Sequence, residues 1–539
     1  MKKILLVFLI FISIAGRTQE QDAWVYFKTK ENTQLYLDNP LMMLSQRALD
    51  RRVAQNIGLD SKDIPISQNF VNQIDAAVGI TVKAQSKWLN AVHVRGSVTA
   101  INSVSTLAFV DRIDFADRTL NTQNRKETKS LANQQDQKVM DVEANFSYGT
   151  SANQIQMLKG NLLHQQDYTG TGKIIAVLDG GFPGVNTTAP FQRLINNNLI
   201  LGGYNFVDRN ENFYTRNNHG TAVLSTMGGY VENQLVGTAP DASYYLFITE
   251  DTNGENPLEE SLWVEAAERA DSLGVDIINS SLGYDTFDNS AYNYSYEDMN
   301  GTVAFITRGA DIAFSRGMIC VISAGNEGNK PWHYITAPAD GFNVLTIGAV
   351  TATRNYASFS SVGPSADGRV KPDVMAQGES AVVANLTGNV SVSNGTSFSS
   401  PIMAGMVACL WQALPNKTNT EIIQLIKESA HLYQNPTDLM GYGIPDFSVA
   451  LGNALGVQES IQEKFTLYPN PVVDYVTVAL PKTINNAKIR VFSIYGQQIL
   501  EQDVTFQNSM ISLGRIESGL YGYTIESDGK TQRGMLIKK

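Results

Sequence analysis

Residues 394–401 read Asn-Gly-Thr-Ser-Phe-Ser-Ser-Pro and place Ser397 at the start of a stretch of small residues. Gly395 and Thr396 allow a tight turn, and a helix is expected to start after the serine, with Pro401 in its first turn, where a missing N–H is tolerated. The partial positive charge at the start of such a helix favours an oxyanion nearby. Taken alone, this pattern is also typical of an ordinary N-cap serine.

Three upstream segments change that interpretation. Asp179 follows the apolar residues 176–178, His219 opens a helical pattern, and Asn326 follows a hydrophobic strand. Together with Ser397 they supply a nucleophile, its base, an orienter for the base and an oxyanion donor. Each also has a structural alternative: a turn aspartate, a buried histidine, or an asparagine in a glycine turn. The combination favours serine hydrolysis.

The order Asp, His, Ser along the chain separates the known serine hydrolase folds. It differs from the order in α/β-hydrolases and in chymotrypsin-like barrels, and Ser399 replaces the second glycine of a Gly-x-Ser-x-Gly elbow. The four motifs resemble those of the subtilisin-like serine peptidases, the subtilase family. The resemblance implies a triad of Asp179, His219 and Ser397, with Asn326 in the oxyanion hole. It also implies substrate-binding segments on either side of the cleft, at Ser281, Leu282, Gly283, Ser323, Ala324 and Gly325.

Some positions depart from the family pattern. Gly180 follows the aspartate where serine or threonine is usual, and Phe398-Ser399 replaces the commoner Met-Ala. Inserted loops are expected at residues 251–257 and 284–302. The pocket linings, with a floor near residues 336–339, are small and uncharged, which predicts an apolar or undiscriminating preference. No cofactor is required; structural calcium is possible, but no ligand-spaced acidic loop assigns a metal.

An α/β class with a doubly wound, mostly parallel sheet is predicted for the central part of the chain. Near-continuous apolar runs are typical of parallel strands buried on both faces, and they occur at residues 173–178, 243–248, 275–279, 318–323 and 344–350. Helical patterns alternate with them at residues 258–273, ended by Gly274, and 303–314. Active groups are expected at the carboxyl ends of the strands.

The length of 539 residues indicates about three domains. Two lysines followed by an apolar run indicate a signal peptide, and no other segment is long and apolar enough to cross a bilayer. A net charge of -11 without a basic stripe argues against nucleic-acid binding. The predicted divisions are a signal peptide (1–18), a prodomain (19–118), a flexible linker with a processing site (119–144), a catalytic domain (145–456) and a β-sandwich (460–539).

The predicted prodomain mixes strand and helix signals. Strands are expected at residues 24–27, 79–82 and 89–94, and an amphipathic helix at 41–57. Its position and α+β pattern resemble the subtilase prodomain, which templates folding and blocks the cleft. A separate binding module is the alternative.

The C-terminal part changes to short alternating strands, expected at residues 475–480, 487–495 and 520–525. The Tyr-Pro-Asn-Pro start at Tyr468, the Tyr495-Gly496 turn and the Lys538-Lys539 end resemble the C-terminal sorting domain of type IX secretion cargo. This resemblance implies a secreted or cell-surface protein that is exported through the periplasm and handled by the type IX machinery. A carbohydrate- or protein-binding sandwich is the alternative.

The sequence therefore predicts a secreted serine endopeptidase that cleaves extended protein substrates through an acyl-enzyme intermediate. A catalytically silent surface-binding protein on the same scaffold and a peptide ligase or macrocyclase remain alternatives. Cys320 and Cys409 both fall on apolar elements, which favours two buried free thiols over a disulfide.

Overall fold

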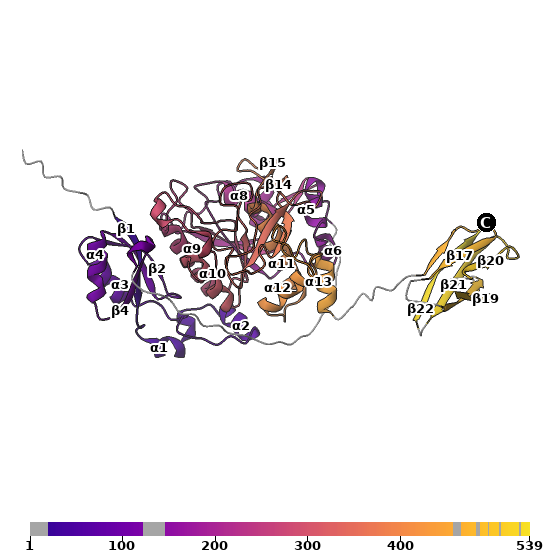
Figure 1. Cartoon of the computed structure of the whole chain (residues 1–539), viewed down its shortest axis with the longest axis horizontal. Coiled ribbons are helices and arrows are strands. Elements are labelled where there is room, and N and C mark those ends of the chain that lie inside the picture. Colours follow the sequence, from indigo (N-terminus) through magenta and orange to yellow (C-terminus); the bar gives the residue numbers. More distant parts are fainter. Residues whose placement is uncertain are drawn as a thin grey trace, which may run out of the picture. The chain divides into compact units, whose positions relative to one another are not determined.

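The computed structural model describes residues 20–121, 146–455, 465–480, 486–493, 495–505, 508–527 and 530–539 (Figure 1). The predicted signal peptide and most of the predicted linker with its processing site lie outside these residues. The chain forms two compact units, Met1–Gly456 and Val457–Lys539, which are described separately. Within the described ranges, no helix is both long and apolar enough to span a bilayer.

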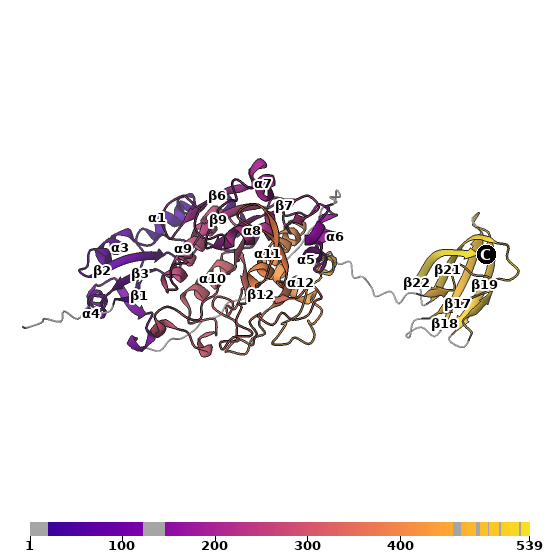
Figure 2. The ribbon, with the colours of Figure 1, turned by 90° about the horizontal axis from the view of Figure 1, so that it is seen from above.

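An antiparallel sheet forms the N-terminal α+β domain, with strand order β2-β3-β1-β4. Helices α3 and α4 pack on one face of the sheet around buried Val71, Ile74 and Ile101 (Figure 2). The element bounds are β1 (Gln21–Phe27), β2 (Ile80–Ser86), β3 (Ala91–Gly96), β4 (Val110–Phe115), α3 (Gln68–Asp75) and α4 (Val98–Ser103). The predicted strands are confirmed within a few residues.

The helix predicted for residues 41–57 is wrong in extent. The chain forms α1 (Thr33–Asp38), a 3-10 turn at Pro40–Met42 and then α2 (Gln46–Ala54). Ser45 fixes the start of α2, because its side chain accepts a hydrogen bond from the backbone N–H of Ala48. These elements form an arm between β1 and α3.

The second face of this sheet packs on the central domain. Trp24 stacks on Phe305, with ring centroids 5.0 Å apart, and its indole N–H donates to the Ser261 hydroxyl at 2.9 Å. Glu268 accepts from the Ser86 hydroxyl at 2.6 Å and from the Trp88 backbone N–H at 2.9 Å. The two domains therefore share one continuous interface.

The arm adds buried charges to that interface. Arg51 and Arg52, both on α2, contact the carboxylate of Asp271, and the Arg52–Asp271 distance is 2.8 Å. Arg52 also pairs with Asp63 at 3.0 Å, and Asp63 pairs with Arg316 at 3.3 Å. No more than 6% of any of these side chains is exposed. Because a buried charge is costly without an opposite charge beside it, each ion in this group is stabilised by its partners.

The central domain contains a seven-stranded sheet with order β13-β12-β11-β10-β5-β9-β6. Each strand runs parallel to its neighbours in the sheet. The predicted doubly wound α/β fold is confirmed: α9 and α10 cover one face, and α8 and α11 the other (Figure 1). The strands are β5 (Ile174–Asp179), β6 (Ile200–Asn205), β9 (Ser243–Ile248), β10 (Ile277–Ser280), β11 (Ile319–Ser323), β12 (Leu345–Val350) and β13 (Val374–Gln377).

The helices of this domain follow the predicted alternation. Gly274 ends α9 in the left-handed conformation, with φ 84°, and its N–H bonds to the preceding turn. The helices are α5 (Ala152–Gln156), α6 (Gly160–His164), α7 (Gln192–Asn196), α8 (His219–Gly228), α9 (Leu258–Leu273), α10 (Phe305–Ser315), α11 (Thr396–Ala413), α12 (Asn419–Glu428) and α13 (Phe447–Ala454). Two hairpins complete the domain, β7 (Tyr230–Val231) with β8 (Leu235–Val236) and β14 (Ala381–Ala384) with β15 (Val390–Ser393). Cys320 and Cys409 are free and buried.

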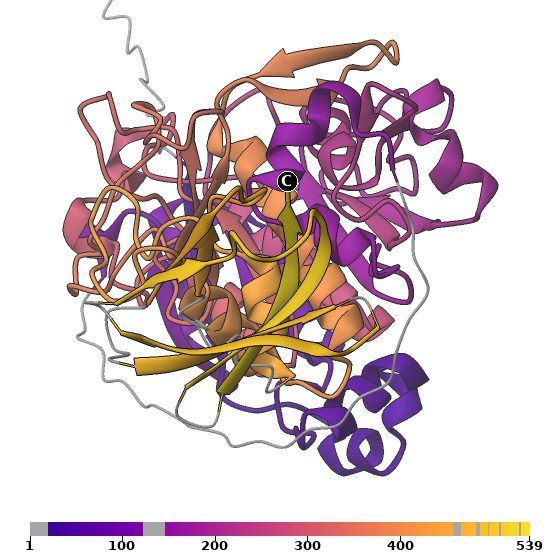
Figure 3. The same cartoon turned by 90° about the vertical axis from the view of Figure 1, so that its right-hand side faces the viewer.

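The C-terminal unit is all β, as predicted (Figure 3). Its antiparallel sheets have the strand orders β16-β17-β20 and β19-β18-β21-β22. Its own apolar core includes Val476, Ile489 and Ile525, each fully buried. The strands are β16 (Thr466–Tyr468), β17 (Tyr475–Ala479), β18 (Asn486–Ser493), β19 (Gln498–Thr505), β20 (Met510–Ser512), β21 (Gly519–Ser527) and β22 (Lys530–Lys538).

Candidate active site

Asp179 is the last residue of β5, an interior strand of the parallel sheet between β10 and β9. Its side chain is fully buried, and Oδ1 accepts a hydrogen bond from the Gly180 backbone N–H at 2.7 Å. Gly180, where the sequence departs from the family pattern, faces Asn217 and Thr252: an added Cβ would lie 3.3 Å from Asn217 Cβ and 3.4 Å from Thr252 Cγ2. A side chain larger than hydrogen would be crowded here.

His219 is the first residue of α8, and its ring Nδ1 lies 2.8 Å and 3.0 Å from the two carboxylate oxygens of Asp179. A carboxylate only accepts, so Nδ1 carries the proton and Nε2 is left as the acceptor. Burial lowers the pKa of His219, but the charge and hydrogen bond of Asp179, helped by the charge of Glu250, raise it above its ordinary value overall. The pair thus forms a basic imidazole with a fixed tautomer.

Ser397 lies within α11, which begins at Thr396 rather than after the serine as predicted. Pro401 is therefore inside the helix, and because it has no N–H, the Ser397 carbonyl loses its partner four residues on. That carbonyl instead accepts from the Ser281 hydroxyl at 2.9 Å. The Ser397 hydroxyl donates to the Ser281 carbonyl at 3.4 Å and makes no hydrogen bond with the His219 ring among the described residues.

The start of α11 nevertheless lies close to His219 and to Asn326. The ring of Phe398 lies 6.1 Å from the ring of His219, centroid to centroid. Thr396 donates to Asn326 Oδ1 twice, from its backbone N–H at 2.9 Å and its hydroxyl at 3.0 Å. With Oδ1 occupied, the Nδ2 group of Asn326 has no partner within the described ranges. Sequence reasoning missed this role of Thr396.

The predicted substrate-binding residues follow two neighbouring parallel strands. Ser281, Leu282 and Gly283 come after β10, and Ser323, Ala324 and Gly325 end or follow β11. The Ser323 hydroxyl donates to the Leu282 carbonyl at 3.4 Å, which links the two segments. Gly283 is exposed, and its backbone makes no hydrogen bond within the described chain, so it can pair with an extended peptide.

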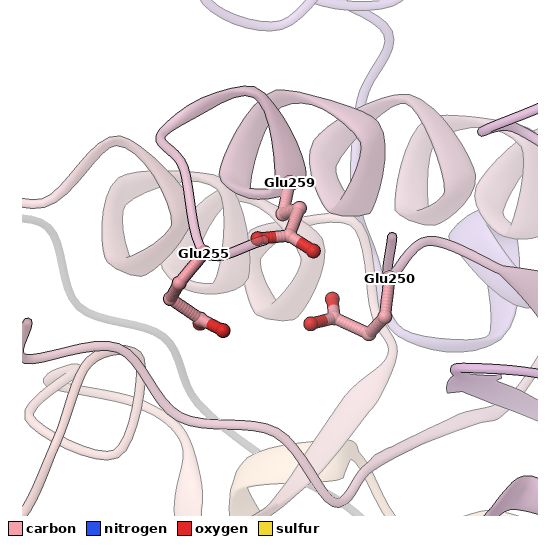
Figure 4. A group of neighbouring side chains, drawn as sticks. All are labelled: Glu250, Glu255 and Glu259. Atoms are coloured by element: carbon pink, nitrogen blue, oxygen red, sulfur yellow. The ribbon is translucent and has the colours of Figure 1, made fainter. Parts of the chain in front are cut away.

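Three glutamates near Asp179 and His219 form a cluster that sequence reasoning missed: Glu250 after β9, Glu255 in the following loop and Glu259 in the first turn of α9 (Figure 4). They offer oxygens that all lie within 4.8 Å of one another. Burial and mutual repulsion raise the pKa of Glu250 to about 8 and that of Glu259 to about 10. In the sequence, the only sign of this cluster is that the three glutamates are five and four residues apart, between the end of a strand and the start of a helix.

Carboxylate oxygens suit calcium, which takes six to eight oxygen ligands. Both oxygens of Glu259 already accept backbone N–H groups, from Asp251 at 2.8 Å and Asn256 at 3.1 Å. Glu250 accepts from the Tyr284 hydroxyl. Three carboxylates supply half or less of a calcium shell, and two of them already accept hydrogen bonds, so calcium stays unassigned.

Comparison with known proteins identifies the family of the central domain. Residues 170–444, just over half of the chain, match the Subtilase family. The chain belongs to the subtilase family. Residues 22–134 of this subtilase match the Peptidase S8 propeptide domain of Bacteroidota, and residues 466–539 match a secretion system C-terminal sorting domain. The sorting domain marks the subtilase as secreted or cell-surface.

Curated relatives cover the catalytic domain. Subtilisin NAT of Bacillus subtilis subsp. natto is 31% identical over 280 residues, which span 51% of this subtilase and 65% of the relative, so less than two thirds of the relative is matched. Subtilisin of Bacillus pumilus is 30% identical over 300 residues, 55% of this chain and 97% of the relative.

Proposed function

We propose that this subtilase is a secreted serine endopeptidase that hydrolyses peptide bonds in extended protein substrates. The observation that carries the proposal is the 2.8 Å contact between buried Asp179 and the His219 ring. The neighbours of Ser397 support it, because Thr396 hydrogen-bonds Asn326 and the Phe398 ring lies 6.1 Å from the His219 ring. A fixed imidazole of raised pKa beside a serine at a helix start is the arrangement that acyl transfer needs.

In the proposed reaction, His219 Nε2 takes the proton of the Ser397 hydroxyl as the oxygen attacks the carbonyl carbon. The hydroxyl must first turn from the Ser281 carbonyl toward the ring; such catalytic hydrogen bonds often tighten only when substrate binds. The protonated ring then gives its proton to the leaving amine, and water hydrolyses the acyl-enzyme by the same steps in reverse order.

Asn326 would stabilise the oxyanion together with the backbone N–H of Ser397. Because Thr396 holds Oδ1, the amide nitrogen is the part of the side chain left to donate. Replacing Asn326 with Ala is expected to lower kcat by about 100- to 1,000-fold, the usual effect of losing one such donor.

The flanking parts fit a zymogen. The N-terminal domain would template folding and block the cleft until the chain is cut in the predicted linker. The C-terminal unit would deliver the enzyme to type IX secretion machinery after passage through the periplasm. Protein or peptide substrates would pair with Ser281–Gly283 on one side and Ser323–Gly325 on the other.

The test compares casein cleavage by the wild type with cleavage by Ser397→Ala and by Ser391→Ala, a control on the exposed part of β15. Activity lost in the first variant alone supports the proposal, whereas equal cleavage by wild type and Ser397→Ala rejects it. Product masses separate hydrolysis, which adds one water for each bond cut, from ligation or cyclisation, which does not.

A further inference from the structure

A cavity of about 580 Å³ lies between the N-terminal domain and the central domain. Trp24 of β1 and Arg112 of β4 line it on one side, and Phe287 and Arg308 of the central domain line it on the other. None of the candidate catalytic or substrate-binding residues belongs to its lining. Small-molecule sites are typically cavities of about 300–1,000 Å³ and often lie between domains, so this cavity has the size and the place of such a site.

Aromatic rings form the apolar part of the lining. Trp24 stacks on Phe305, with ring centroids 5.0 Å apart and ring planes 10° from parallel. Phe287 meets Tyr294 edge to face, at 5.7 Å between centroids. Trp24 and Phe287 each keep 7% of their surface exposed, so neither residue is fully sealed in the core. A flat apolar group can pack against such rings.

Arg308 lines the cavity from the first turn of α10 and is only partly buried. Its Nη2 donates to the Tyr26 hydroxyl at 2.6 Å, which holds the guanidinium in place. No carboxylate of the described chain forms an ion pair with it, and its Nε has no hydrogen-bond partner among the described residues. A partly buried cation is costly without an opposite charge beside it. An anion is therefore the group that this cavity lacks.

The other arginines of the lining already have partners. Arg112 pairs with Asp111 at 3.2 Å and with Asp114 at 3.3 Å. Arg118 pairs with Asp298 at 2.8 Å. These ion pairs leave Arg308 as the lining arginine without a carboxylate partner in the described part of the chain.

Glu260 is the remaining carboxyl group of the lining. It accepts hydrogen bonds from the Tyr294 hydroxyl at 2.6 Å and from the Ile306 backbone N–H at 3.0 Å. Burial raises the pKa of Glu260 to about 7, although these hydrogen bonds and the charge of Arg308 lower it. At neutral pH the carboxyl is only partly ionised, so it does not fully balance the charge of Arg308.

We propose that this cavity binds a small molecule that carries one carboxylate on a flat apolar body. The carboxylate pairs with Arg308, and the body lies against the rings of Trp24 and Phe287. A guanidinium donates two parallel hydrogen bonds to a carboxylate, which a neutral group of the same shape does not match. Because both domains supply the walls, the ligand binds only while the N-terminal domain is docked and therefore stabilises the docked state.

The test measures binding of 3-phenylpropanoate and of its uncharged amide, 3-phenylpropanamide, by isothermal titration calorimetry. The protein is the full chain carrying Ser397→Ala, which prevents self-digestion. The carboxylate is expected to bind with a Kd of about 1 mM or lower, a modest free energy for each ligand atom. The amide should bind about 10- to 100-fold more weakly, because hydrogen bonds between charged groups are the stronger ones. Equal affinity for the two probes, or no binding of the carboxylate, overturns the inference.

Arg308→Met keeps an unbranched side chain but removes the charge, so this variant should bind the carboxylate no better than the amide. Arg354→Met, at an exposed position, is the control and should keep the ratio of the parent. If Arg308→Met does not fold, Val303→Trp narrows the same cavity without removing a charge and should weaken the binding of both probes by about 10-fold. An unchanged ratio in Arg308→Met, or unchanged affinities in Val303→Trp, overturns the inference.

The effect on activation rests on the proposed peptidase function. In the wild-type chain, saturating 3-phenylpropanoate should lengthen the lag before casein cleavage begins without changing the final rate, and the amide at the same concentration should not. Equal lags would overturn the claim that the ligand holds the two domains together. A wild type that never cleaves casein rejects the peptidase proposal instead and leaves the calorimetric result standing.

Discussion

Ser281 supports the residue that we propose as nucleophile. Pro401 removes the N–H that would pair with the Ser397 carbonyl, and the Ser281 hydroxyl takes its place at 2.9 Å. The first turn of α11 is thus tied to the end of β10 at the serine itself. This tie fixes the backbone of Ser397 while its hydroxyl stays free to turn.

Ser281→Ala is expected to lower the free energy of unfolding by about 1–3 kcal/mol, because it leaves a buried carbonyl unpaired. In a Pro401→Ala background the cost should be smaller, since an alanine at this position can supply the missing helical N–H. Urea unfolding of both variants and the double variant, all carrying Ser397→Ala to prevent self-digestion, measures this coupling. Equal costs in the two backgrounds would contradict the explanation.

Individual site residues were predictable where a motif is local. Asp179 at a strand end and His219 at a helix start follow from short runs of sequence, and the contact between them follows from the fold. The Thr396 bonds to Asn326 and the Ser281 bond to Ser397 join residues 70 and 116 positions apart. No local pattern marks such pairs, because the partners meet only when the sheet and α11 are assembled.

At the scale of elements, the end of β9 and the start of α9 bring Glu250, Glu255 and Glu259 together. All three carboxyls have pKa values raised above the ordinary 4.5, first by burial and then by repulsion from neighbouring carboxylates. The folded state thus binds more protons than the unfolded chain. The contribution of these groups to stability is therefore fully present at acidic pH. It is lost as the pH rises from the ordinary pKa through about 8 for Glu250 and about 10 for Glu259.

Glu255→Gln should reduce the loss of stability at high pH. The Glu255 carboxylate accepts no hydrogen bond among the described residues, so it contributes mainly repulsion of its neighbours. The measurement is Tm against pH in the Ser397→Ala background, with EDTA present to remove any cation. Between neutral and alkaline pH, the variant is expected to lose less stability than its parent. Glu232→Gln, at an exposed position, should follow the parent; an identical profile for Glu255→Gln would refute the account.

The α2 arm joins the N-terminal domain to α9 through buried charges. Asp271→Asn leaves Arg51 and Arg52 without their shared counter-ion, so it should cost about 3–5 kcal/mol. Asp111→Asn is a matched control, because the Asp111–Arg112 pair is exposed on both sides and should matter by about 1 kcal/mol or less. Denaturant unfolding of the full chain with Ser397→Ala compares the two, and similar losses would show that burial of the pair is unimportant.

At the scale of the whole molecule, the C-terminal unit has a core of its own, separate from that of Met1–Gly456. Removal of residues 466–539 is therefore expected to leave the Tm of the first unit unchanged while abolishing export. Calorimetry and the fraction of protein found outside the cell measure the two effects. A lower Tm for the first unit would mean that the two units stabilise each other.

The architecture was predictable because buried parallel strands leave long apolar runs, such as Ile174–Asp179, and because Gly274 marks the end of α9. The arm was not, since residues 41–57 have one helical periodicity and the cap at Ser45 decides where α2 begins. No sequence pattern predicts that Arg51 and Arg52 of this arm pair with Asp271.

The two thiols make the opening of the first unit directly measurable. Cys320 lies in β11 and Cys409 in α11, both fully buried, and burial raises both thiol pKa values. Only the thiolate reacts with alkylating reagents, so modification waits for the sheet to come apart. Because the chain has just these two cysteines, the rate of alkylation reports on the first unit alone and is silent about the sorting domain.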